Sequence, residues 1–311
     1  MKNFEIASGA SRPRKDDGDT SRPRKDDGEA ALSHNDRRGV IIKFGIAFAI
    51  MLVAYLPTFK WMLDRRMVSG SYYGHGFLIP LISIYIVWQR KNILKKINLT
   101  SEPKGLALVV VGLLIHIATA SLRVYFISGF SFVIVLYGLL LFCFGKEISK
   151  NLIFPVFFLL AMIPLPLVLI GTLTVKLKLF VAQTATFVLN NIGFPSIRDG
   201  SMIRMPNSHI IVAAPCSGLR SLIALITLGV LFSFASKVSY FKKSVIFLSS
   251  IPIALATNIV RIIMLAVVND LYGEKATMGF FHDFTGFVMF GIAFIALYNV
   301  SHALDRQKEK Q

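Results

Sequence analysis

Stretches of about twenty consecutive apolar residues recur along this 311-residue chain, and they constrain its fold more than any other feature. Their apolar residues occupy every side of a helix, whereas a surface helix is apolar on one stripe only. A helix of about twenty apolar residues is long enough to cross a bilayer. The sequence therefore predicts an all-α polytopic membrane protein with about eight transmembrane helices, at residues 40–59, 76–93, 105–122, 127–145, 151–171, 216–235, 244–268 and 284–302.

The formal net charge of +17 comes from the connections between these stretches. Residues 1–39 hold nine Lys or Arg against eight Asp or Glu, so this segment is almost neutral. The rest of the chain carries 25 basic and nine acidic side chains, mostly in short loops. Basic residues concentrate in cytoplasmic loops of membrane proteins. The charge thus indicates membrane topology, and we expect no nucleic-acid partner.

The first 39 residues contain a tandem repeat. Residues 11–20 and 21–30 are identical at eight of ten positions and are rich in charge, Pro and Gly. Such a composition cannot bury a core, so residues 1–39 are predicted to be a disordered tail. No cleavable signal pattern precedes the first apolar stretch, which we expect to remain as an anchor. Residues 40–302 then form the membrane domain, and residues 303–311 a short basic end.

Three basic connectors define the predicted topology: residues 89–104, 236–243 and 305–311. Eight crossings place all three, with the N-terminus, on the cytoplasmic side. A further crossing by the partly polar residues 172–193 would move the last two outside, so this stretch is predicted to be interfacial or re-entrant. Residues 195–214 alternate apolar and polar side chains around turn residues, which is typical of a short hairpin, here on the outer face.

A thiol, a guanidinium and an imidazole are expected at similar depth near the outer surface. Cys216 begins a span there, and His282 precedes the last span. Arg261 lies about seventeen residues along a span that starts inside, which at about 1.5 Å per residue reaches the outer third. A thiolate is the nucleophilic form of cysteine, and a helix N-terminus, an arginine or an imidazolium favours it. Imidazole carries protons near neutral pH, and a guanidinium stabilises an oxyanion.

Each of the three residues also has a structural interpretation. A cysteine at a helix start is often a small packing residue, and His282 beside Asp283 is compatible with a polar helix cap. An arginine inside a span costs roughly 2.5–3.5 kcal/mol on insertion scales, so Arg261 needs a partner, a function or access to the lipid headgroups. The combination of the three favours a thiol enzyme. Cys143, within an apolar run, is expected to pack inertly.

Other chemistries have little support in the sequence. His75 precedes the second span, where it either lines the same cavity or caps a helix, and His209 is a weak candidate in the hairpin. The histidines show no metal-ligand spacing, and the chain has no Walker loop, dinucleotide fingerprint or HExxH motif. We therefore expect no metal and no cofactor.

Three motifs resemble those of the exosortase and archaeosortase family. They are Ala-Pro-Cys-Ser-Gly-Leu-Arg-Ser around Cys216, Asn-Ile-Val-Arg-Ile around Arg261 and His-Asp-Phe-Thr-Gly from His282. Tyr-Gly-His-Gly-Phe-Leu-Ile-Pro and Arg-Asp-Gly-Ser-Met-Ile also resemble family segments, so the likeness covers roughly residues 40–302. Each motif is short, but their joint order is specific. The repeat in the tail lies outside the resemblance.

The resemblance implies a multispanning cysteine transpeptidase that processes exported proteins bearing a short C-terminal sorting segment of the PEP-CTERM type. Cys216 would be the nucleophile, His282 the acid and base, and Arg261 the stabiliser of the transition state. The supporting residues would be Arg220, Ser217, Asn258 and His75. The implied location is a bacterial inner membrane, with both termini cytoplasmic and the site outside. The implied partners are membrane-anchored substrates, the bilayer and a polysaccharide or lipid acceptor.

A second hypothesis belongs to another class of protein. Transporters also retain charged side chains inside the membrane, so Arg261 and Arg220 would equally suit a non-catalytic transporter or export-machine subunit that binds an anionic lipid or polysaccharide. Such a protein would tolerate loss of the Cys216 thiol but not of Arg261. A thiol enzyme would tolerate neither.

Overall fold

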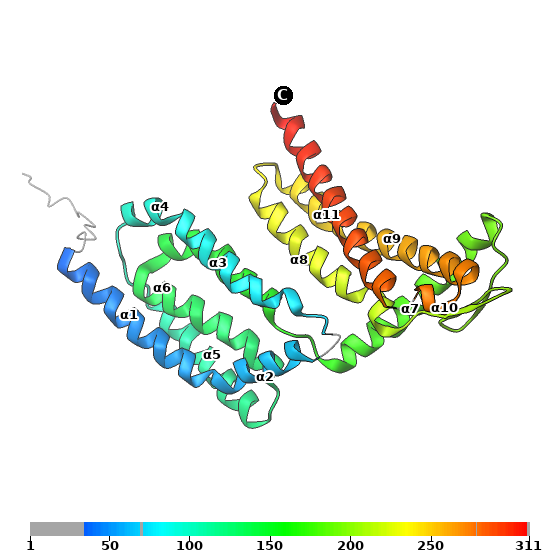
Figure 1. The fold of residues 1–311 in the computed structure, drawn as a ribbon. Coiled ribbons are helices and arrows are strands. Elements are labelled where there is room, and N and C mark those ends of the chain that lie inside the picture. The colour runs from blue at the N-terminus through cyan, green and yellow to red at the C-terminus, as the bar shows by residue number, and fades with distance from the viewer. Residues whose placement is uncertain (1–33, 69–70, 278, 310–311) are drawn as a thin grey trace, which may run out of the picture. The chain divides into compact units, whose positions relative to one another are not determined.

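The structure is a computed structural model that describes residues 34–68, 71–277 and 279–309. These residues form mainly helices (Figure 1). The decamer repeat predicted at residues 11–30 lies outside the described residues. The first helices are α1 (His34–Ala54), α2 (Leu56–Met67), η1 (Gly74–Phe77), α3 (Leu78–Gln89), α4 (Lys91–Lys96), α5 (Lys104–Ser121), α6 (Tyr125–Phe158) and η2 (Leu159–Met162).

The remaining helices and the strands follow a short connection after η2. They are α7 (Leu167–Asn191), β1 (Ile197–Asp199), β2 (Met202–Arg204), β3 (His209–Ile211), η3 (Ala214–Cys216), α8 (Leu219–Ala235), α9 (Tyr240–Tyr272), α10 (Glu274–Thr277) and α11 (Phe280–Glu309). Helix α11 continues past the boundary predicted at residue 303.

Helix α6 is the central element of the first six helices, because α1, α2, α3 and α5 all pack against it. The contact with α5 depends on small residues: a Cβ on Gly105 would lie 2.3 Å from the backbone nitrogen of Phe142. Small residues allow membrane helices to approach closely. Polar side chains pair between the helices, with the Tyr55 hydroxyl 2.8 Å from Ser131 Oγ.

Helix α6 reverses direction at Gly145, where φ is 79°. The rings of Tyr137 and Phe157 lie 5.6 Å apart, although twenty residues of straight helix would separate them by about 30 Å. A glycine is required at the bend, because a Cβ there would lie 2.0 Å from Thr100 Oγ1. Helix α6 therefore has two antiparallel arms. The first corresponds to the stretch predicted at 127–145, and the second overlaps only the start of the stretch predicted at 151–171, whose last residues belong to α7.

Helix α9 is the central element of the rest of the chain. It packs against α8, α11 and α7, and these helices lie side by side in Figure 1. Buried apolar residues of α7, α9 and the strands form one core, which includes Val181, Leu189, Ile203 and Ile262. Cys216 belongs to this core.

Three short antiparallel strands, in the order β1-β2-β3, occupy the segment for which a hairpin was predicted. Their register pairs Ile203 with both Arg198 and Ile210. The end of α9 holds the turn between β2 and β3, because Asp270 Oδ1 accepts from the Asn207 backbone and the Ser208 hydroxyl at 3.1 and 3.2 Å. The sheet thus brings the chain from α7 to η3, beside α9.

The predicted count of eight spans is not confirmed. Within the described part of the chain, five helices are long and apolar enough to cross a membrane, or six if α1 and α2, which meet at 58°, form one bent span. Two predicted spans are shorter helices, at Gly74–Gln89 and Leu219–Ala235, and the two arms of α6 count as one. Conversely, α7 contains residues 172–191 of the stretch predicted to be interfacial, yet it is long and apolar enough to cross.

Candidate active site

Cys216 lies at the end of η3, just before the first turn of α8. Gly218 caps α8 in the left-handed conformation, with φ at 82°, which glycine adopts without a steric penalty. The Ser217 hydroxyl donates to the Ala214 carbonyl at 2.8 Å and stabilises the turn. The Cys216 side chain is only 7% exposed and faces the core beside the positive end of the α8 dipole.

His282, on the first turn of α11, is the hydrogen-bond partner of this thiol. Its Nε2 lies 2.9 Å from Cys216 Sγ, although 66 residues separate the two in the sequence. Its Nδ1 lies 3.1 Å from Asp283 Oδ1. A carboxylate only accepts hydrogen bonds, so Asp283 favours the tautomer protonated at Nδ1. The lone pair on Nε2 then faces the thiol.

Arg261 on α9 contacts the same imidazole. One terminal nitrogen donates to the His282 carbonyl at 3.0 Å and lies 3.3 Å from its Nε2. The guanidinium occupies the space that a side chain at position 286 would take, since a Cβ on Gly286 would lie 3.2 Å from that nitrogen. Arg261 Nε is buried and has no hydrogen-bond partner within the described part of the chain. A positive group with a free donor therefore lies beside the thiol and the imidazole.

Asn258, also on α9, connects this helix to the turn that carries Cys216. Its Nδ2 donates to the Cys216 carbonyl at 3.2 Å. Its side chain packs against Gly218, where an added Cβ would lie 2.7 Å from the amide carbon. Asn258 and Arg261 are three residues apart and so lie on one face of α9. This face positions both the turn and the imidazole.

Burial and the nearby charges act on the pKa of the Cys216 thiol in opposite directions. Burial raises the pKa of Cys216, whereas the charges of Arg261 and Arg220 lower it and that of Asp283 raises it again. The net direction is upward, which differs from the lowered pKa that the sequence suggested. The physical reason is that η3 packs into the core, and loss of water disfavours the thiolate. Burial thus favours the neutral thiol over the thiolate.

Two predicted supporting residues lie apart from this contact network. Arg220 is exposed on α8 and acts on Cys216 through its charge alone. His75 lies in η1, where its ring centroid is 6.4 Å from that of Tyr73 and its charged neighbour is Arg66. His209 is in β3, where its carbonyl accepts from Asn269 at 3.0 Å. Among residues 34–68, 71–277 and 279–309, no three His, Cys, Asp or Glu side chains cluster to hold a metal.

Three residues of the network were not assigned a role from the sequence: Asp283, Gly218 and Gly286. All three lie within the motifs quoted around Cys216 and His282. The helical spacing from His282 to Gly286, four residues, places them on one face of α11. This spacing was the sequence signal that could have linked Gly286 to the site. The close approach of Arg261 to Gly286 is visible only in the tertiary structure.

The fold and this site define a polytopic helical membrane protein in which a buried cysteine contacts a half-buried histidine beside an arginine. Residues 61–299 match the family described as transmembrane exosortase. The chain belongs to this family, which is named for protein sorting. The matched region includes Cys216, Arg261, His282 and His75. No curated protein and no solved structure matches the chain.

Proposed function

We propose that this exosortase is an integral-membrane cysteine peptidase and transpeptidase that cleaves the C-terminal sorting segment of exported proteins. The observation that carries the proposal is the 2.9 Å contact between Cys216 Sγ and His282 Nε2. A nucleophile, a base within hydrogen-bond distance and a third group that orients the base are the requirements of covalent acyl transfer. Asp283 is the orienting group in this assignment.

In the first half-reaction His282 Nε2 takes the thiol proton while Cys216 Sγ attacks the carbonyl carbon of the scissile peptide bond. The negative charge moves to the carbonyl oxygen, which Arg261 stabilises through its unpaired donor. Collapse of this intermediate breaks the C–N bond, and His282 returns the proton to the leaving amine. A thioester on Cys216 remains, and the segment with its apolar helix departs.

In the second half-reaction water or an acceptor amine attacks the thioester, and His282 again removes a proton. The sulfur leaves as a thiolate and is reprotonated, which restores the resting thiol. Water gives hydrolysis, and an amine gives transfer to a surface acceptor. We place the site at the outer face of the bacterial inner membrane, in a pathway linked to surface protein and exopolysaccharide export.

The test uses a tagged protein that ends in a short Pro-containing motif, one apolar span and a basic tail. Membranes with the unaltered enzyme should shorten it and accumulate a thioester adduct on Cys216. Cys216→Ser and Arg261→Ala should each lower the rate by at least about 10²-fold, the scale of a lost catalytic group. Cys143→Ser, on α6, is the matched control and should process normally.

Two outcomes would contradict the proposal. Normal cleavage by Cys216→Ser would make the cysteine structural. If Arg261→Ala alone were defective, the non-catalytic transport hypothesis would replace it. Immunoblots of each variant show that the protein is present in the membrane at equal amounts.

A further inference from the structure

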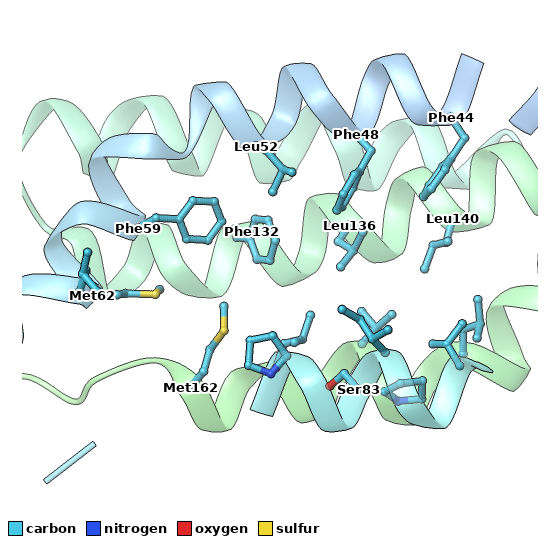
Figure 2. Close-up of a pocket in the computed structure, with 18 of the residues that line it drawn as sticks. Phe44, Phe48, Leu52, Phe59, Met62, Ser83, Phe132, Leu136, Leu140 and Met162 are labelled. Carbon is cyan, nitrogen blue, oxygen red and sulfur yellow. The ribbon is translucent and has the colours of Figure 1, made fainter. Parts of the chain in front are cut away.

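An elongated cavity of about 710 Å³ lies among α1, α2, α3 and α6, and the catalytic proposal makes no use of it. Figure 2 shows Met62 and Met162 at one end and Phe44 and Leu140 at the other, with aromatic and aliphatic side chains between them. Phe44, Phe48 and Leu52 follow at one-turn spacing, so one face of α1 lines it over about 12 Å. A lining of this kind suits a long apolar group as the ligand.

The cavity reaches the surface of the protein within the membrane region. Leu63 and Ile84 contribute to its lining and are 42% and 66% exposed. Helix α6, and α1 with α2 as one bent pair, are candidate membrane spans, so lipid would be the surroundings of the cavity opening if these helices cross the bilayer.

One end of the cavity carries a positive charge. Arg66 lines it, and its terminal nitrogen donates to the Met162 carbonyl at 2.6 Å. Its Nε is buried without a hydrogen-bond partner, and it forms no ion pair with any described carboxylate. The guanidinium lies over the Phe77 ring, 5.1 Å from the centroid, and against Gly76. A half-buried guanidinium without a counter-ion is costly in apolar surroundings, so this end is complementary to an anion.

Two further polar atoms support a ligand here. Ser83 lines the cavity, and its hydroxyl is buried without a hydrogen-bond partner in the described chain. His75 lies close enough to Arg66 to sense its charge, and its Nε2 is also buried and unpaired among the described residues. Buried polar groups are normally satisfied, so the unpaired Ser83 hydroxyl in the cavity and the unpaired His75 Nε2 near Arg66 each indicate a missing partner.

We propose that this cavity binds an anionic phospholipid, with one acyl chain along Phe44, Phe48 and Leu136 and the phosphate at Arg66. The apolar part of the cavity accommodates the acyl chain, and its opening at the protein surface gives access from the bilayer. The positive charge of Arg66 selects an anionic headgroup. The site is separate from Cys216, and the inference does not depend on the thiol chemistry.

The test is native mass spectrometry of the full-length protein in detergent, with phosphatidylglycerol or phosphatidylcholine added. The unaltered protein should retain phosphatidylglycerol in preference to phosphatidylcholine. Arg66→Gln should reduce that preference by about fivefold, the contribution of one arginine near an anionic headgroup. Arg65→Gln is the matched control, because its guanidinium lies over Trp61 on the same helix and does not line the cavity. It should change the preference little.

Two more variants keep the result interpretable. Arg66→Lys retains the charge and should retain the preference. Ser83→Phe projects a ring into the cavity and should lower retention of both lipids, with its folding checked by thermal melting. Equal retention of both lipids by the unaltered protein, an equal effect of the two Gln variants, or full retention by folded Ser83→Phe would overturn the proposal. So would displacement of the lipid by a peptide that copies an apolar sorting segment.

Discussion

At the residue scale, burial and positive charge act on Cys216 in opposite directions. Burial raises the pKa of the thiol, and the guanidinium of Arg261 only partly offsets this effect. In the proposed mechanism the proton therefore passes to His282 as the substrate is attacked, so the mechanism depends on the orientation of the imidazole as well as on the sulfur.

The first prediction concerns Asp283, which is 76% exposed but accepts from His282 Nδ1 in the assigned tautomer. Asp283→Asn removes the charge and keeps the shape. We expect a rate of substrate processing about tenfold lower, less than the roughly 10²- to 10⁴-fold contribution of a general base, because water screens an exposed carboxylate. Asp305→Asn, far along the same helix, is the control. Equal rates for both variants would remove Asp283 from the mechanism.

At the element scale, the site depends on close approaches between helices. Helix α9 presents Asn258 and Arg261 from one face, and α8 and α11 supply Gly218 and Gly286 opposite them. A glycine in the interior of a helix costs about 1 kcal/mol relative to alanine, so Gly286 lowers the intrinsic stability of α11. The space that it leaves is occupied by the guanidinium of Arg261.

The second prediction separates this role from stability. Gly286→Ala should displace Arg261 by a few tenths of an ångström and lower processing, while the midpoint of thermal unfolding stays equal or rises. Gly291→Ala on the same helix meets no atom within 4 Å and should keep full activity. Thermal melts and processing rates of the two variants form the measurement. A fully active Gly286→Ala enzyme would show that Arg261 tolerates the displacement.

At the scale of the whole molecule, the open question of topology is whether α7 crosses the bilayer. Its 25 residues are long enough to do so, yet it carries Lys176 and Lys178 and packs beside η3. If α7 lies along the surface, the strands and Cys216 share a side with the loop before α3. If it crosses, they share the side of the basic α4.

The third prediction uses single cysteines in a Cys143→Ser, Cys216→Ser background. Asn207→Cys, in the exposed turn after α7, should react with a membrane-impermeant maleimide added outside intact cells. Lys95→Cys, in the exposed basic helix α4, should react only after permeabilisation. Labelling of both positions only after permeabilisation would mean that α7 crosses and that the site faces the cytoplasm.

Most helix positions follow from the sequence, because apolar stretches of membrane length have few alternatives to a helix in lipid. On this basis spans were predicted at residues 105–122 and 244–268, and these positions correspond to helices α5 and α9. The two arms of α6 were separable because the glycine and the charges near residue 145 interrupt the apolar pattern. Lengths were less predictable, since packing and not hydropathy decides where an element begins and stops: α3 ends at Gln89 and not at 93, α8 begins at Leu219 and not at 216, and the segment at 195–214 has three strands.

For the candidate site, the sequence by itself determined which residue types occupy the borders of the apolar stretches: a cysteine at a helix start, an arginine that is costly in a span and a histidine at the next border. Only the tertiary structure decided that Cys216 and His282 are in hydrogen-bond contact, that Arg261 fits against Gly286, and that Arg220 and His75 lie outside this network. The physical reason is that local residue patterns set the cost and position of each group along a helix. Contacts across 66 residues depend on how α8, α9 and α11 pack around one another.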